Sequence, residues 1–333
     1  MKNALISIVV PCFNEEKAIP FFIDEIKKIE LKMKEKYMVA FEYIFVDDGS
    51  SDETKKIIKD YSAKYENIRY IIFSRNFGKE GAIYAGMQKC KGEYVAIMDV
   101  DLQDPPSMLL EMYETVTISD YDAAAARRVT RKGEPIIRSF FARCFYKLIN
   151  KISQTEIVDG ARDFRLMKRG MVDSILTLTE YNRFSKGIFS WVGFKTKWLE
   201  YENIERVAGE TKWSFFKLLC YSIEGIVAFS TVPLAISLIV GTLFCFTSLA
   251  AGIIILILSI ISETGNASYA GLICIAFLLA GIGLMCNGIQ GQYISKTYTE
   301  VKRRPIYIAK EESDDAQKTA DFDSCSSNAS CNL

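Results

Sequence analysis

The most constraining feature of the sequence is a long stretch with almost no charge. From Gly225 to Ser295 the only formally charged residue is Glu263. Two apolar runs lie within it, Pro233–Ile261 and Ala267–Ile289, and each exceeds the ~20 residues needed to cross a hydrocarbon core of ~30 Å. A buried helix of a soluble protein rarely runs so long without a charge. The sequence therefore predicts two transmembrane helices within residues 231–296.

The charges around these two runs predict an orientation. The connecting segment, residues 262–268, holds one acid and no base. Basic residues flank the pair instead, with Lys212 and Lys217 before it and Lys296, Lys302, Arg303 and Arg304 after it. Because lysine and arginine are retained on the cytoplasmic side, we expect a multi-pass protein of the cell (inner) membrane with both termini in the cytoplasm.

The segments beside the predicted spans have their own patterns. Residues 213–230 are apolar but interrupted by Lys217 and Glu224, which is typical of an amphipathic helix at the membrane interface. Residues 297–333 are expected to form a cytoplasmic tail, largely disordered after residue 310, because that part is acidic and then rich in Ser and Asn. Glycines in the second run permit a homo-oligomer, although the ordinary glycine content of a membrane helix explains them equally well.

Composition excludes several classes of protein. The 333 residues include 41 Lys plus Arg and 41 Asp plus Glu, so the chain lacks the basic surplus typical of nucleic-acid binding. It contains no histidine, which excludes Ser-His-Asp catalysis and histidine metal ligands. The nine cysteines form no Cys-x-x-Cys pair, which argues against a zinc ribbon and favours reduced thiols.

Residues 1–212 alternate strand and helix patterns. Short runs rich in apolar residues predict strands at 5–10, 41–46, 68–74, 94–98 and 123–126. Helical patterns follow at 15–36, from 51 or 52 to 65, at 80–89, and from Pro105 onward. This alternation predicts an α/β domain with an open parallel sheet and helices on both faces. Ligands of such sheets bind at the carboxyl ends of the strands.

Acids follow the predicted strand at 94–98. Asp99 and Asp101 are two residues apart, so in extended backbone they face the same side. With the amide oxygen of Gln103 they form a hard oxygen site suited to Mg²⁺ or Mn²⁺, which could neutralise a diphosphate leaving group. Alternatively, Asp-x-Asp is a common loop pattern, with Asp104 capping the next helix. The sequence lacks a Gly-x-Gly-x-x-Gly after the first strand, which disfavours a dinucleotide cofactor, and it lacks a P-loop.

Two more acids, Asp47 and Asp48, end the predicted strand at 41–46. They could accept hydrogen bonds from a base N–H or from ribose hydroxyls. Alternatively, they form an Asx-turn before the next helix, and Asp52 suits the role of helix cap.

An ordered series of motifs runs through residues 5–230. It comprises Val9–Glu15, Val46–Thr54, Ser74–Lys79, Asp99–Pro106, Asp163–Met167, Asn182–Phe184, Trp191–Phe194 and Gly209–Trp213. On these motifs the chain resembles family 2 glycosyltransferases, and more narrowly polyprenyl-phosphate glycosyltransferases of the GtrB and dolichol-phosphate mannose synthase type. The resemblance implies a GT-A fold: a Rossmann-like, mostly parallel sheet with helices on both faces, followed by interfacial helices and two transmembrane helices.

The resemblance also implies roles for individual residues. The nucleotide-sugar pocket would be formed by Pro11, Phe13, Glu15, Asp47, Asp48, Gly78 and Lys79. Asp99, Asp101 and Gln103 would hold the metal and the donor diphosphate. Asp163 stands where a catalytic base is usually proposed, although many relatives have Gly at the position of Arg162. Alternatively, Asp163 only pairs with Arg162 or Arg165.

The expected acceptor is a lipid phosphate. Its second pKa is about 6, so it does not require a strong base, and Asp163 could instead orient the donor or an arginine. The cations expected to bind this phosphate are Arg127, Arg131 and Arg138. Alternatively, this basic group forms a solvated face or attracts anionic lipids.

Taken together, the motifs and the two spans indicate a metal-dependent, inverting glycosyltransferase. The expected donor is a nucleotide diphosphate sugar, with UDP-glucose or a related UDP-sugar favoured over GDP-mannose, and the acceptor is polyprenyl phosphate on the cytoplasmic leaflet. A processive polysaccharide synthase is the first alternative, but its Gln-x-x-Arg-Trp motif is missing. The second alternative is a catalytically silent scaffold or flippase partner, against which the intact acids argue.

Overall fold

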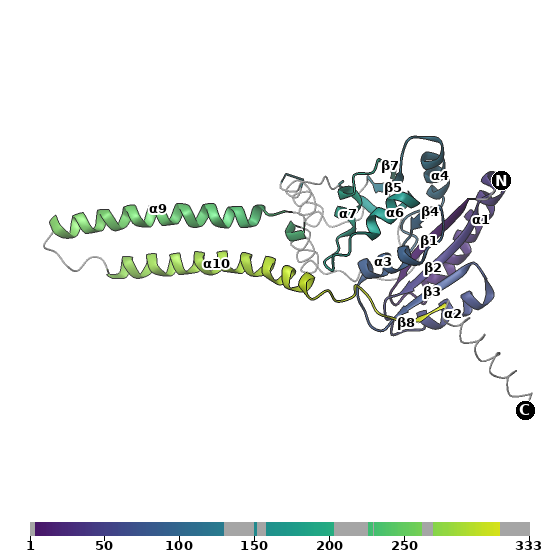
Figure 1. The fold of residues 1–333 in the computed structure, drawn as a ribbon, viewed down its shortest axis with the longest axis horizontal. Coiled ribbons are helices and arrows are strands. Elements are labelled where there is room, and N and C mark those ends of the chain that lie inside the picture. The colour runs from purple at the N-terminus through teal and green to yellow at the C-terminus, as the bar shows by residue number, and fades with distance from the viewer. Residues whose placement is uncertain are drawn as a thin grey trace, which may run out of the picture.

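The computed structural model describes residues 4–129, 150–151, 158–202, 226–228, 230–261 and 269–313. An α/β domain at one end carries a hairpin of two long helices that projects away from it (Figure 1). Segments 130–149 and 203–225 fall outside these ranges. Most of the predicted interfacial helix at 213–230 and the motif at 209–213 therefore lie outside the described residues.

An eight-stranded sheet forms the centre of the domain, in the order β7-β5-β6-β4-β1-β2-β3-β8. Its strands are β1 Leu5–Cys12, β2 Ala40–Asp47, β3 Ile68–Phe73, β4 Tyr94–Ile97, β5 Ala123–Arg128, β6 Ala161–Lys168, β7 Thr196–Tyr201 and β8 Ala309–Glu312. The first four are parallel to one another, as the alternation predicts. β6 runs antiparallel to both β4 and β5, and β8 runs antiparallel to β3.

Helices cover both faces of the sheet (Figure 1). They are α1 Ala18–Tyr37, α2 Thr54–Lys64, α3 Lys79–Lys89, α4 Met108–Ile118, α6 Arg169–Leu176 and α7 Ser185–Trp191. Two apolar clusters result, because alternate strand residues face opposite sides. Ile8 and Val10 of β1 pack with Phe22 of α1 in one cluster, whereas Val9 packs with Ile83 of α3 in the other. Predictions of an α/β domain with two covered faces are confirmed.

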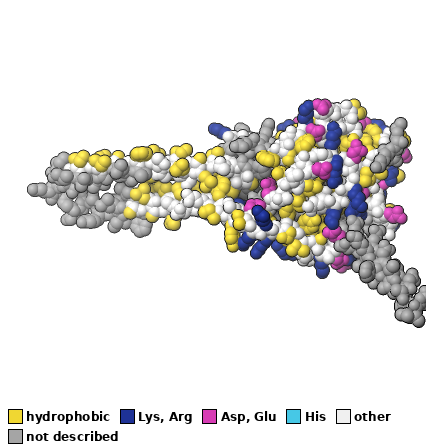
Figure 2. Space-filling model, in the orientation of Figure 1, with side chains coloured by type: hydrophobic (Ala, Val, Ile, Leu, Met, Phe, Trp, Pro, Cys, Tyr) yellow, Lys and Arg dark blue, Asp and Glu magenta, His cyan; other side chains and the backbone are white. Residues whose placement is uncertain are grey.

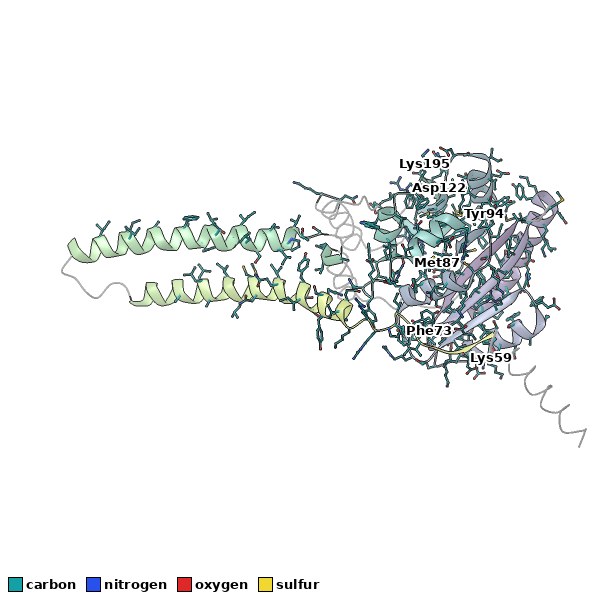
Figure 3. All side chains as sticks on the ribbon, in the orientation of Figure 1. Lys59, Phe73, Met87, Tyr94, Asp122 and Lys195 are labelled. Carbon is teal, nitrogen blue, oxygen red and sulfur yellow. The ribbon has the colours of Figure 1, made fainter. Side chains whose placement is uncertain are left out.

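Close packing of α3 on β1 depends on Gly86. A Cβ added there would lie 2.2 Å from Cγ1 of Val9, so no larger residue fits without moving the helix. This contact holds the second half of α3 against the middle of β1. The labelled side chains of Phe73 and Met87 lie within the same domain (Figure 3), and both are almost fully buried.

Some element ends differ from the sequence prediction. α4 begins at Met108, not at Pro105, because residues 105–107 form a turn in which the Pro105 carbonyl accepts a hydrogen bond from Met108 N. Asp52 accepts a hydrogen bond from Thr54 N at 3.1 Å, but it stands one residue before the N-cap of α2, which is Glu53 and has no side-chain cap bond. The strands β6, β7 and β8 were not predicted.

The two long helices are α9 Val232–Ile261 and α10 Tyr269–Val301. They lie side by side, and the hydroxyl of Tyr293 donates to the Ser230 carbonyl at 2.5 Å. Large apolar side chains such as Leu238 and Leu284 face outward along the hairpin (Figure 2). Among the described residues, no helical stretch is both long enough and apolar enough to cross a membrane.

After α10 the chain returns to the α/β domain. The carboxylate of Glu300 accepts hydrogen bonds from the backbone N–H groups of Tyr181 and Asn182, and β8 then pairs with the outer edge of β3. Ion pairs of Lys59 (Figure 3) with Glu311 and of Lys89 with Glu312 hold β8 in place. Residues 297–301 of the predicted tail thus belong to α10 and residues 309–312 form an edge strand of the sheet, whereas residues 314–333 lie outside the described part.

Candidate active site

Acidic residues gather where the central strands end. β4, β1 and β2 are adjacent and parallel, so their carboxyl ends meet at one edge of the sheet. Asp47 ends β2, Asp48 follows it, and Asp99 and Asp101 follow β4. The edge that the sequence predicts as the binding site therefore does carry the predicted acids.

Lys79 joins two of the candidate functional residues. Its Nζ lies 2.7 Å from Oδ1 of Asp99 and 2.5 Å from Oδ2 of Asp163. Antiparallel pairing explains this meeting: Ile97 of β4 is opposite Arg165 of β6, and continuing that register by two residues brings Asp163 beside Asp99. Lys79 reaches both because α3 begins at this edge, directly after Gly78.

The electrostatics of this cluster follow from its geometry. Burial raises the pKa of Asp163, but the charge of Lys79 outweighs that effect and holds the pKa well below its usual range. Burial likewise disfavours charged Lys79, yet Asp163 and then Asp99 outweigh it and raise its pKa. Asp163 and Lys79 are therefore both charged at neutral pH. The Lys79 side chain is 42% exposed, so solvent weakens these attractions.

The residues at the end of β4 fit a divalent metal of the Mg²⁺ type. No group of three or more Asp, Glu, Cys or His side chains that could enclose a metal occurs within the described ranges. Mg²⁺ nevertheless binds through one or two carboxylates when substrate phosphates complete its coordination. Asp99 and Asp101 supply such a pair. The Oδ1 of Asp101 accepts a hydrogen bond from Gln103 N at 3.2 Å, which orients it within the loop.

Arg162 is a residue whose position the sequence could not explain. Its Nε donates to Oδ1 of Asp104 at 2.9 Å, and its Nη2 donates to Oε1 of Gln103 at 3.3 Å. The Tyr201 hydroxyl also donates to Asp104. Asp104 is 5% exposed and is bound by Arg162 and Tyr201, so it does not cap α4 as the alternative reading proposed. Arg162 thus braces the loop from Asp99 to Asp104.

Asp47 and Asp48 are both buried and accept hydrogen bonds from backbone N–H groups. Asp47 is fully buried and accepts from Ser50 N, as in the turn that the sequence left as an alternative. Asp48 accepts from the backbone N–H groups of Phe77 and Gly78, at 2.6 and 3.1 Å for its Oδ1. It therefore holds the loop that leads to Lys79. Burial raises the pKa of Asp48 to about 6.

The tight turn after β2 brings these loops together. Gly49 has a φ of +70°, and a Cβ there would lie 2.5 Å from the carbonyl carbon of Arg75. Only glycine allows this approach.

The loop after β1 is the third side of the candidate pocket. Asn14 N donates to Oγ of Ser50 at 2.9 Å, and Glu15 N donates to Oγ1 of Thr54 at 2.8 Å. These bonds fix the loop beside the end of β2. The Phe13 side chain is 37% exposed, which leaves an aromatic face accessible at this edge, and Pro11 and Glu15 are partly buried next to it.

Only one of the three predicted phosphate-binding arginines is described. Arg127, near the end of β5, donates through Nε to the Asp159 carbonyl at 3.1 Å, and its Nη1 lies 3.2 Å from Oε1 of Glu200. Arg131 and Arg138 lie outside the described residues.

Two further buried groups near Asp163 were missed by the sequence analysis. Arg165 is 2% exposed; its guanidinium lies 3.6 Å from the ring centre of Phe189 and donates to the Arg162 carbonyl at 3.0 Å. Burial lowers its pKa to about 10. Glu80 accepts from Ser185 N at 3.1 Å and ties α7 to the start of α3. The carboxylate of Asp163 therefore pairs with Lys79, and among the described residues it forms no ion pair with Arg162 or Arg165, contrary to the alternative. An Arg within the Asp-Phe-Arg motif was the one signal for Arg165.

A mostly parallel sheet with metal-compatible acids and a cation at its carboxyl edge defines an α/β transferase of the GT-A type. Residues 7–176 match the family described as glycosyl transferase family 2. The chain belongs to this family, and it is a glycosyltransferase.

Sequence similarity to known relatives extends over nearly the whole chain. The chain is 39% identical to the prophage bactoprenol glucosyl transferase homolog of Escherichia coli K12, over 92% of this chain and 98% of that protein. It is also 39% identical to the bactoprenol glucosyl transferase of Shigella phage SfV, with the same coverage of both chains. A solved mannosyltransferase from Pyrobaculum calidifontis aligns with 90% of this chain and 88% of its own at 16% identity and a TM-score of 0.43.

Proposed function

We propose that this protein transfers a sugar, with inversion, from a nucleotide diphosphate sugar to polyprenyl phosphate at the cytoplasmic leaflet of the cell membrane. UDP-glucose or a related UDP-sugar is the favoured donor, with GDP-mannose as the next candidate. The names of the bactoprenol glucosyl transferases that match over nearly the whole chain support the acceptor and the sugar. The observation that carries the proposal is the cluster of Lys79, Asp99 and Asp163 at the carboxyl edge of the sheet.

The donor would lie across this edge. Phe13 would stack on the base, with Pro11 and Glu15 beside it, while Asp47 and Asp48 shape the pocket by holding the loops to Ser50 and Gly78. Asp99, Asp101 and Gln103 would hold Mg²⁺ or Mn²⁺ together with the donor diphosphate. Bound there, the metal supplies charge neutralisation of the leaving nucleoside diphosphate. Lys79, at the same edge, adds a second positive charge.

The proposed transfer does not require a strong base. An oxygen of the acceptor phosphate forms a bond to the anomeric carbon from the face opposite the donor diphosphate, whose bond to that carbon breaks. The acceptor oxygen is already largely anionic at neutral pH. Asp163 has a strongly lowered pKa, so it is a weak base there, and its role is to orient the sugar and Lys79. Arg127, Arg131 and Arg138 would bind the acceptor phosphate through guanidinium contacts.

A membrane location brings the acceptor to this edge. α9 has 30 residues and α10 has 33, which at 1.5 Å per residue makes each longer than a hydrocarbon core of ~30 Å. The charge-poor sequence from Gly225 to Ser295 supports two spans, with residues 213–230 at the interface and residues 1–212 and 297–333 in the cytoplasm. Glycines of α10 permit a homo-oligomer.

The test uses purified full-length protein in detergent with polyprenyl phosphate and a panel of radiolabelled UDP- and GDP-sugars. Each donor is incubated with Mn²⁺, with Mg²⁺ or with EDTA, and label in the organic phase is counted. We expect metal-dependent transfer from one UDP-sugar. Transfer that persists in EDTA would contradict the metal role, and a polymeric product or no transfer from any donor would contradict the proposed reaction.

A further inference from the structure

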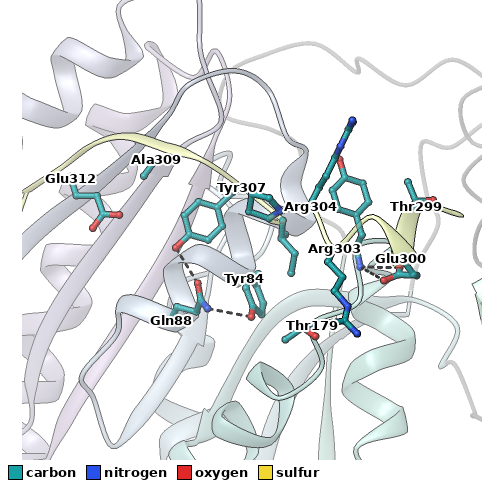
Figure 4. Close-up of a pocket in the computed structure, with 13 residues that line it drawn as sticks. Tyr84, Gln88, Thr179, Thr299, Glu300, Arg303, Arg304, Tyr307, Ala309 and Glu312 are labelled. Carbon is teal, nitrogen blue, oxygen red and sulfur yellow. Dashed lines mark hydrogen bonds between the residues drawn. The ribbon is translucent and has the colours of Figure 1, made fainter. Parts of the chain in front are cut away.

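A second cavity lies away from the reacting groups, where α10 meets the α/β domain (Figure 4). We call it the junction cavity; it measures about 840 Å³, and its lining includes Tyr84, Tyr181, Glu300, Arg303, Arg304 and Tyr307. Tyr84 is five residues beyond Lys79 on α3, which corresponds to about 7.5 Å along the helix axis. A ligand in this cavity would therefore be separate from the donor and its metal.

The charges of the junction cavity are not balanced by contacts within the protein. Both of its acids are engaged: Glu300 accepts from the N–H groups of Tyr181 and Asn182, and Glu312 lies 2.5 Å from Nζ of Lys89. Over the described residues, neither Arg303 nor Arg304 has an acidic partner. Figure 2 shows Lys and Arg side chains gathered where the hairpin joins the domain. Two guanidinium groups are thus available to an anionic ligand.

A chain of two hydrogen bonds ends at the same cavity (Figure 4). The Tyr307 hydroxyl donates to Oε1 of Gln88 at 3.0 Å, and Nε2 of Gln88 donates to the Tyr84 hydroxyl oxygen at 3.2 Å. Tyr84 is only 6% exposed, and it is one of the residues that line the cavity. Its hydroxyl oxygen accepts from Gln88, and its O–H can donate to a ligand oxygen in the cavity.

The cavity is positioned near the membrane surface. On the proposed function, on which this inference rests, α10 leaves the hydrocarbon at about Ser295, after which charged residues resume. Arg303 then follows about 10 Å beyond Lys296 along the chain, and long arginine side chains reach back toward the interface. Phosphate oxygens accept bidentate hydrogen bonds from guanidinium groups. We propose that the junction cavity binds the phosphate headgroup of an anionic phospholipid through Arg303, Arg304 and the Tyr84 hydroxyl.

Such binding would couple the membrane to the catalytic domain. The Glu300 and Lys296 contacts to Asn182 and its neighbour already join α10 to the loop before α7. A headgroup held between α10 and α3 would add a link to the helix whose first residue is Lys79.

The experiment measures lipid retention on the purified full-length protein by native mass spectrometry, with phosphatidylglycerol and phosphatidylcholine supplied together. Wild type is expected to retain phosphatidylglycerol preferentially. The double variant Arg303→Ala/Arg304→Ala should lose about tenfold in that preference, and Tyr84→Phe about threefold, because it removes only the hydroxyl. Lys310→Ala, which removes an equally exposed charge outside the cavity, should retain wild-type preference.

Several results would overturn the proposal. Equal retention of phosphatidylglycerol by all variants would show that the junction cavity is not its binding site. A loss in the double variant with no change in Tyr84→Phe would indicate general attraction to a basic surface, not binding in the cavity. Displacement of the lipid by inorganic phosphate would assign the site to a soluble anion, and preferential retention of polyprenyl phosphate would assign it to the acceptor.

Two controls distinguish loss of lipid binding from misfolding and from a failure of the proposed function. Matching thermal unfolding curves, and recovery of retention in Arg303→Lys/Arg304→Lys, exclude misfolding as the cause of a loss. Sugar transfer is measured on the same preparations. Transfer without selective retention contradicts the junction cavity alone, whereas selective retention without transfer contradicts the proposed function alone.

Discussion

The carboxyl edge of the sheet and the junction cavity differ in whether their charged side chains form ion pairs within the protein. At the carboxyl edge, Asp99 and Asp104 of one loop and Asp163 of β6 are each bound by a cation from another segment, Lys79 or Arg162. At the junction cavity, Arg303 and Arg304 are adjacent in sequence and exposed. Where charges are internally paired, removing one leaves its partner uncompensated. Where they face solvent, removing one costs the fold little.

The largest effect on transfer is expected from Asp101→Asn at the carboxyl edge of the sheet. Removing one of two carboxylate ligands should lower transfer about 10³-fold, because the metal stabilises the leaving diphosphate by several kcal/mol. Initial rates in the organic-phase assay measure it. The exposed acid Asp120, which pairs with Lys195, provides the matched control Asp120→Asn, and equal activity of both variants would refute the metal site.

Lys79→Met tests whether the two acids depend on one cation. Transfer is expected to fall about 100-fold, as for loss of one charge-stabilising group. A double-mutant cycle with Asp163→Asn should show coupling of about 1 kcal/mol, reduced by the partial exposure of Lys79. Additive effects in the cycle would mean that the ion pair does not contribute to transfer.

Arg162→Ala should reduce stability more than any surface change. Among the described residues it leaves Asp104, which is 5% exposed, with only the Tyr201 hydroxyl as a donor, so the free energy of unfolding should fall by about 2 kcal/mol. Denaturant unfolding measures the loss. Arg162→Ala/Asp104→Asn should recover part of it, because the uncompensated charge is removed, and no recovery would argue against the buried pair.

Donor binding should weaken as pH falls through about 6. Asp48 has its pKa raised to about 6 by burial, so above that pH its carboxylate accepts hydrogen bonds from Phe77 and Gly78. Below it, protonation removes that acceptor and loosens the loop before Lys79. We expect a loss of about tenfold in donor affinity between pH 7 and 5 by calorimetry. An identical pH profile in Asp48→Asn would assign the effect to another group.

The same protonation acts on stability with the opposite sign. Between the unfolded pKa of about 3.9 and the folded value of about 6, the native state binds a proton that the unfolded chain does not. Asp48 therefore adds stability as pH falls through that window, while donor affinity declines.

The smallest effect is expected at the junction cavity. Arg303→Ala should change the free energy of unfolding by no more than about 0.5 kcal/mol, because the side chain is exposed and has no ion-pair partner among the described residues. Denaturant unfolding of Arg303→Ala and Arg162→Ala under the same conditions compares the two losses in the free energy of unfolding. A loss as large as that of Arg162→Ala would erase the distinction between the two regions.

Local sequence determined much of the fold and part of the site. The alternation of apolar strands with amphipathic helices predicted β1 to β5 and α1 to α4, because periodicity of 2 or 3.6 residues is a property of neighbouring positions. The spacing of Asp99 and Asp101 predicted their common face for the same reason. The run from Gly225 to Ser295 predicted two transmembrane helices within residues 231–296. Two long helices, α9 and α10, lie over most of that range, and their spanning of a membrane stays a prediction.

Only the tertiary structure decided which distant residues meet. The antiparallel strand β6 brings Asp163 beside Asp99, and α3 brings Lys79 to both. Arg162, a departure from the motif, becomes the partner of Asp104, and β8 returns from beyond α10 to the edge of β3. None of these pairings leaves a local signal, since the partners are separated by tens to hundreds of residues. The sequence determines the elements and the residue types at their ends, whereas strand order and direction determine which charges become partners.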